Sequence, residues 1–133
     1  MRSRHARRRH AALMPRLRAL RSRRPGARLG RAYEVFYDAR EALRIVLEDE
    51  IEAGVRAVCP TATGLDVEVY SDELSELRGR LIAVNSCLDL GEEHHDALVY
   101  QLADALAALL DDWAITASAV ATEIGFRPLP AHP

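Results

Sequence analysis

Apolar residues recur at helical spacing between Arg31 and Val58, with charged residues on the remaining faces. The repeated apolar positions are Phe36, Ala39, Leu43, Val46 or Leu47, Ile51, Val55 and Val58. This spacing predicts a long amphipathic helix that packs the apolar stripe into a core. Proline pushes the residue before it out of the helical conformation, so Cys59-Pro60 predicts the end of the helix.

The pattern then changes to the alternation that is typical of strands. Residues 65–70 alternate apolar and polar side chains, which indicates a half-buried strand. Residues 81–84 form a second apolar stretch after a short polar segment. We predict an antiparallel hairpin with a loop of about six residues, in which Glu68 opposes Arg78 or Arg80 on the exposed face.

A second amphipathic helix is predicted after the hairpin. Asp89 followed three residues later by Glu92 has the pattern of a capping box at the start of a helix. The apolar stripe that follows consists of Leu98, Leu102, Ala105 or Leu106, Leu109 and Trp113. Residues 116–126 fit either a short helix or a third strand at the edge of the sheet, and we favour the strand.

Together these elements predict a small two-layer α+β domain of α-β-β-α order, with an antiparallel hairpin packed on two amphipathic helices. We place this domain at residues 32–126, before a frayed proline-rich tail at 127–133. Residues 1–31 form an arginine-rich arm for which two interpretations stay open. It is either a disordered segment or in part a mistaken start, because GC-rich DNA translated upstream of Met14 would also encode arginine without lysine.

Charge divides the chain at this boundary. Residues 1–31 carry 12 of the 18 arginines and no acid, whereas the rest carries six arginines against 20 acids. Charge of this size influences partners more than fold. Guanidinium groups neutralise phosphates without regard to base sequence, so the arm predicts non-specific nucleic-acid binding. The candidate residues are Arg7, Arg8, Arg9, Arg21, Arg23 and Arg24.

One cluster has the character of metal ligands, formed by Glu92, His95 and Asp96. Glu92 and His95 are three residues apart and share a helix face, as in di-iron carboxylate sites. Such sites need a second motif of this kind, which the chain lacks, so we favour a role in helix capping. Nucleophile motifs, phosphate-binding loops and zinc spacings are also missing. We therefore expect a protein that is not an enzyme and uses no metal or cofactor.

The densest acidic run lies on the first helix, and we predict that it forms a solvated face. Glu48, Asp49 and Glu52 of this run are the candidate partner-binding residues. The main hypothesis is a non-enzymatic interaction or regulatory module whose acidic body binds a protein, a basic one in particular. A homodimer stays open. The alternative hypothesis is a nucleic-acid-associated protein that is anchored by its arginine-rich arm.

The expected location is the cytoplasm. No apolar stretch reaches the roughly 20 residues that span a bilayer, and the arginine-rich start does not fit a secretory signal. Two isolated cysteines without a secretory signal indicate reduced thiols. We therefore expect no association with a membrane.

Overall fold

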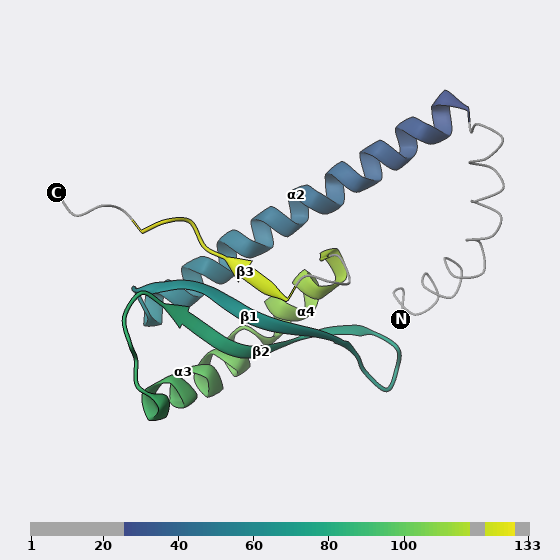
Figure 1. Cartoon of the computed structure of the whole chain (residues 1–133). Coiled ribbons are helices and arrows are strands. Elements are labelled where there is room, and N and C mark those ends of the chain that lie inside the picture. Colours follow the sequence, from purple (N-terminus) through teal and green to yellow (C-terminus); the bar gives the residue numbers. More distant parts are fainter. Residues whose placement is uncertain (1–25, 118–121, 130–133) are drawn as a thin grey trace.

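The computed structural model describes residues 26–117 and 122–129 of the chain. Figure 1 shows the order of its elements, which are α2 (Ala27–Val58), β1 (Ala62–Ser71), β2 (Leu77–Ser86), α3 (Glu92–Ala105), α4 (Ala107–Thr116) and β3 (Glu123–Gly125). The predicted two-layer α+β class is confirmed, with a small antiparallel sheet as one layer and helices as the other. No helix within these described ranges is long and apolar enough to cross a membrane.

The sheet contains three antiparallel strands in the order β2-β1-β3. β1 and β2 form the predicted hairpin, and Glu68 pairs with Arg80 across it. The carboxylate and guanidinium groups of this pair lie 3.9 Å apart on the exposed face. β3 pairs with the other edge of β1, where Ile124 lies opposite Leu65. The prediction of a third strand at the edge is therefore confirmed for Glu123–Gly125, while Thr116 belongs to α4 and residues 118–121 of the predicted range lie outside the described residues.

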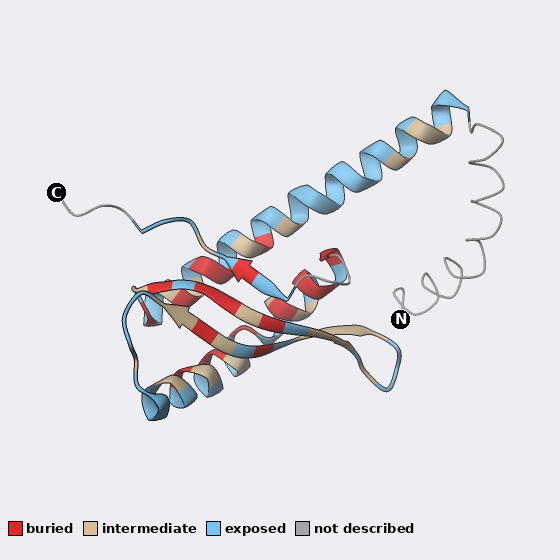
Figure 2. Cartoon of the chain, viewed as in Figure 1, coloured by how far each residue is buried: buried red, intermediate tan, exposed pale blue. Residues whose placement is uncertain are grey.

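One apolar core joins the sheet to the helices, and Figure 2 shows the buried residues concentrated at this junction. The C-terminal part of α2 contributes three side chains to it, Leu47, Ile51 and Val55. The other members of the core include Leu65, Val67, Leu81 and Val84 from the sheet, Leu98, Leu102, Leu110 and Trp113 from the later helices, and Ile124 from β3. Trp113 is the largest side chain that is fully buried.

The second predicted helix is divided at Leu106 into α3 and α4. Leu106 has φ −103° and ψ 4°, outside the helical range. Its N–H nevertheless donates to the Leu102 carbonyl at 2.8 Å, and its own carbonyl accepts the N–H of Leu110 at 2.9 Å. The break is therefore a kink and not a loop. It allows α3 to follow β2 while α4 contacts both β2 and α2.

The start of α3 differs from the expected capping box. Gly91 is the residue before the helix, with φ 75°, a conformation that glycine adopts at little cost. The Asp89 side chain accepts the Gly91 N–H at 2.9 Å and forms a local turn instead of capping the first helical turn. The prediction that Asp89 caps this helix is therefore wrong.

Helical side chains cover the outer edge of β2. Gly79 N–H donates to the Asp111 carboxylate at 3.1 Å, and Val84 N–H donates to His95 Nε2 at 3.1 Å. α4 passes so close that a Cβ on Gly79 would lie 2.5 Å from the Leu110 carbonyl oxygen. Unpaired edge amides invite pairing with a strand of another molecule, so these two contacts protect the edge.

α2 extends beyond the domain that it joins, as Figure 1 shows. It begins at Ala27, so residues 27–31 belong to this helix and not to the predicted arm. Its 32 residues span about 48 Å, whereas a 10-residue strand spans about 33 Å, and the sheet therefore cannot cover its whole length. We call Ala27–Val46 the projecting half.

Within the projecting half, the prediction of a packed stripe is wrong. Phe36, Ala39, Leu43 and Val46 are exposed, as Figure 2 shows for most of this segment. Val58, at the other end of α2, is also exposed. The helical periodicity is real, but none of these four positions belongs to the buried core.

Candidate interaction surface

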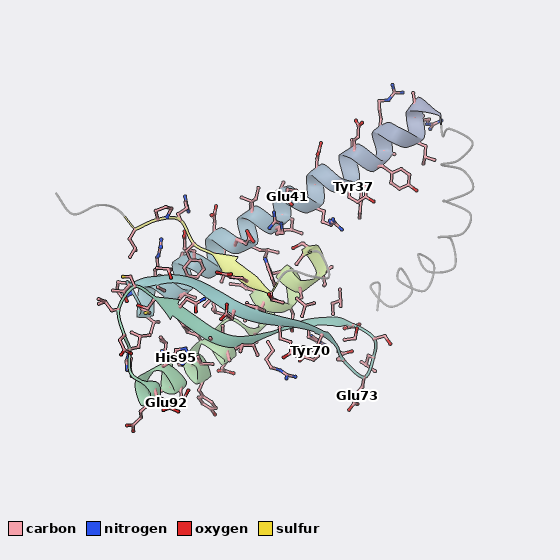
Figure 3. All side chains as sticks on the ribbon, viewed as in Figure 1. Tyr37, Glu41, Tyr70, Glu73, Glu92 and His95 are labelled. Atoms are coloured by element: carbon pink, nitrogen blue, oxygen red, sulfur yellow. The ribbon has the colours of Figure 1, made fainter. Side chains whose placement is uncertain are left out.

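Two of the three predicted metal ligands, Glu92 and Asp96, are exposed, and the third, His95, makes a hydrogen bond within the fold. Nε2 of His95 accepts the Val84 N–H, so this nitrogen joins α3 to the sheet and is not available as a ligand. Its Nδ1 lies 3.7 Å from an Asp96 carboxylate oxygen. Figure 3 shows Glu92 and His95 at the start of α3. In the described part of the chain, no group of three histidine, cysteine or acidic side chains could hold a metal ion.

The predicted partner-binding acids are engaged with groups of the same chain. Glu48 accepts a hydrogen bond from the buried Trp113 indole at 3.3 Å and another from Arg44 at 3.1 Å. Asp49 lies 3.2 Å from the Arg127 guanidinium. These contacts join α2 to α4 and to the segment after β3. Binding of a partner by these acids stays a prediction, since it would compete with the internal contacts.

Glu52 is buried, which corrects the expected solvated position. Only 10% of its side chain is exposed. Its carboxylate accepts the Arg127 N–H at 2.6 Å and also pairs with the guanidinium groups of Arg56 and Arg127, each at 3.2 Å. Arg56 in turn donates to the Arg127 carbonyl at 2.5 Å. This network fastens the segment after β3 to α2.

The hairpin loop contains a second network, centred on Asp72 and Arg78. The Asp72 carboxylate accepts the N–H groups of Glu76 and Leu74 at 2.9 and 2.8 Å, and Arg78 Nε donates to it at 2.9 Å. Arg78 also pairs with Asp111 of α4 at 3.0 Å. The Glu76 N–H first, and then the Arg78 guanidinium, hold the pKa of Asp72 below its ordinary value.

A depressed pKa in the folded state makes the charged Asp72 stabilising, with a defined pH dependence. This contribution is complete above the ordinary aspartate pKa of about 3.9 and is lost as pH falls through the lower folded value. We expect Asp72→Asn to be less stable than the wild type at neutral pH and to approach it at strongly acidic pH. Urea unfolding over a pH series measures both. A difference that did not change with pH would contradict this prediction.

All six predicted nucleic-acid-binding arginines lie outside the described residues. Two other arginines of the predicted arm, Arg28 and Arg31, lie in the first turns of α2 and are exposed. The structure therefore places a positive charge at the tip of the projecting half.

The projecting half carries a continuous apolar face. An α-helix advances by about 100° per residue, and eight apolar positions between residue 29 and residue 46 fall within an arc of about 140°. No charged residue of this segment lies within the arc. We call this surface the apolar face, and its members are Leu29, Ala32, Val35, Phe36, Ala39, Ala42, Leu43 and Val46.

The apolar face is distinct from the face of α2 that packs into the core. Ile51 and Val55 are directed about 110° and 150° around the helix axis from the centre of the apolar face, whereas Leu47 lies about 70° from it, at its edge. The core therefore meets the apolar face only at its edge, at Leu47, and its members from Ala32 to Val46 stay exposed. Val35 and Val46 are 68% and 56% exposed.

The other sides of the projecting half are polar or aromatic, apart from the exposed Ile45. Tyr33 and Tyr37 stack with their ring centroids 6.3 Å apart, and the Arg40 guanidinium lies 5.3 Å from the Tyr37 centroid. Arg44 pairs with Glu41, and this hydrogen bond is the main cause that lowers the pKa of the Glu41 carboxyl. Figure 3 shows Tyr37 and Glu41 on this part of the helix, away from the body. These contacts stabilise the helix without help from the core.

Sequence reasoning identified four of the eight residues of this surface, Phe36, Ala39, Leu43 and Val46, but assigned them to the core. The signal that could have separated the apolar face from the core-facing residues of α2 is the change in angular position around the helix between Val46 and Ile51. The chain matches no protein-family model, no curated protein and no solved structure.

Proposed function

We propose that this protein is a non-enzymatic interaction module whose contact element is the projecting half of α2. The observation that carries the proposal is the apolar face, which spans about five helical turns and is exposed from Ala32 to Val46. Single exposed apolar side chains are common on proteins, whereas a contiguous apolar patch marks a binding surface. Amphipathic helices bind partners through residues at this spacing.

The contacts of the acidic run support placing the contact surface on the apolar face. Glu48 and Glu52 make hydrogen bonds that hold α2 to Trp113 and Arg127. A partner that bound these carboxylates would have to break their hydrogen bonds to Trp113 and Arg127. A partner on the apolar face would replace only water, and burying a valine or leucine there contributes about 1.5–3 kcal/mol.

Two adjacent residues provide a matched test of this proposal. Val46 lies on the apolar face and is 56% exposed, whereas Ile45 lies outside it and is 50% exposed. We expect Val46→Glu to lower the affinity for the partner at least about 10-fold, because a charge would enter the buried contact. Ile45→Glu should leave the affinity within about twofold of the wild type, since its side chain remains in water.

The measurement is quantitative co-purification of bound protein from the native host with the wild type and both variants. A differently tagged copy of this chain is included among the proteins that are quantified. Circular dichroism and thermal unfolding establish that the body of each variant is intact. Equal recovery with Val46→Glu and Ile45→Glu would refute the apolar face as the contact surface.

A further inference from the structure

We infer that the partner on the apolar face is a second copy of this chain, with the two α2 helices antiparallel about a two-fold axis near Ala39. This inference rests on the proposed function, because it names the occupant of the same surface. A two-fold contact brings identical patches together, so the patch must be complementary to itself. Three features of α2 meet this condition.

The first feature is the charge at the two ends of the apolar face. Arg28 precedes the face and Glu50 follows it, and both lie at angular positions within the same arc. Both are exposed, and neither forms an ion pair with another described residue. In an antiparallel pair centred on Ala39, Arg28 of each copy lies opposite Glu50 of the other, because the two positions are equally far from the centre.

The second feature is the distribution of large and small side chains along the face. With the same centre, Phe36 lies opposite Ala42 and Val46 lies opposite Ala32, while Val35 and Leu43 lie opposite each other. Large side chains opposite small ones interdigitate and let two helices approach closely. The centre itself is Ala39, so the two backbones meet without a bulky residue on the axis.

The third feature is that the parallel arrangement is unfavourable. Parallel helices in register would bring Arg28 against Arg28 and Glu50 against Glu50. Like charges at both ends would then oppose association, and Phe36 would meet Phe36. Charge and side-chain size therefore select the same antiparallel register.

Analytical ultracentrifugation of the full chain tests the stoichiometry. We expect a reversible monomer–dimer equilibrium over an approximately 100-fold range of protein concentration. Because each substitution occurs twice in a symmetric dimer, Val46→Glu should weaken dimerisation by roughly 100-fold or more. Ile45→Glu should leave the dimerisation constant within about twofold of the wild type.

Charge reversal tests the register and the identity of the partner together. Arg28→Glu alone and Glu50→Arg alone should each weaken the homodimer by roughly 10-fold at low salt, since each places like charges at both ends. An equimolar mixture of the two variants should restore the wild-type constant, because the heterodimer contains an Arg–Glu pair at both ends. The double variant Arg28→Glu/Glu50→Arg should also dimerise with the wild-type constant, because each of its copies again places opposite charges at the two ends.

The possible outcomes separate this inference from the proposed function. A chain that is monomeric at every concentration overturns the inference. The proposed function survives this result if a different protein co-purifies with the wild type and with Ile45→Glu but not with Val46→Glu. Monomers would also result if residues 1–25 of the same chain covered the apolar face. A dimer that is insensitive to Val46→Glu, or charge variants that the mixture does not rescue, would also overturn the inference.

Discussion

Replacing Glu52 with alanine should destabilise the protein by about 2–4 kcal/mol, since the substitution leaves a partly buried Arg56 guanidinium without its carboxylate. The Arg127 N–H loses its acceptor in the same step. Both effects are larger than those of a surface ion pair because water cannot fully replace the lost contacts. Urea unfolding at neutral pH measures the change in the free energy of unfolding.

Asp49→Ala is the matched control, since Asp49 pairs with the same Arg127 but both of these side chains are largely exposed. An exposed pair contributes about 0–1 kcal/mol. Amide hydrogen exchange locates the effect. In Glu52→Ala, we expect faster exchange at the N–H of Phe126, which donates to the Thr63 carbonyl. We expect the same at the N–H of Val67, which donates to the Thr122 carbonyl. Equal destabilisation by the two substitutions would show that burial of Glu52 does not account for the change in the free energy of unfolding.

Gly79→Ala should destabilise the protein by about 1–3 kcal/mol, through a clash between β2 and α4. The added methyl would lie 2.5 Å from the Leu110 carbonyl oxygen and 3.2 Å from its Cβ. The nearest atom belongs to the backbone of a packed helix, so no side-chain rotation relieves the contact. Moving α4 would also stretch the hydrogen bond from Gly79 N–H to Asp111. Thermal and urea unfolding should both detect the loss.

Gly30→Ala makes the same chemical change in the projecting half and should have the opposite sign. No heavy atom lies within 4 Å of the position of its Cβ, and Gly30 lies inside the helix α2. Alanine in an exposed helix is more favourable than glycine by roughly 1 kcal/mol, which should appear as increased helicity of α2 and not as a change in the core. A loss of stability with Gly30→Ala, or none with Gly79→Ala, would contradict these contacts.

The elements of the sheet could be predicted because their signals are local. Alternation at residues 65–70 reports a strand with one face buried, and Cys59-Pro60 marks the end of α2. The pairing of Glu68 with Arg80 follows once the two strands of a hairpin are placed in register. Such features depend on neighbours in the sequence, which is why sequence analysis reached them.

Features that depend on distant segments escaped prediction. Glu52 and Arg127 are 75 positions apart, and nothing near either residue indicates that they meet. Periodicity groups Phe36 with Ile51 as apolar positions of one helix, but it does not report which of them another element covers. The prediction of the α3 cap was wrong for another reason. Asp89 accepts the Gly91 N–H in a local turn and so does not cap the first turn of the helix.

The length of the projecting half also determines how far the charges of the chain act. Arg31 lies about 24 Å along the helix axis from Leu47, where α2 enters the core. At physiological salt, the electrostatic potential decays over about 8 Å, so roughly three screening lengths separate this arginine from the acidic body. The acids of the sheet and α3 therefore have little effect on an anionic molecule at the tip of α2, where the nearest acid to Arg31 in the sequence is Glu34 of the same helix.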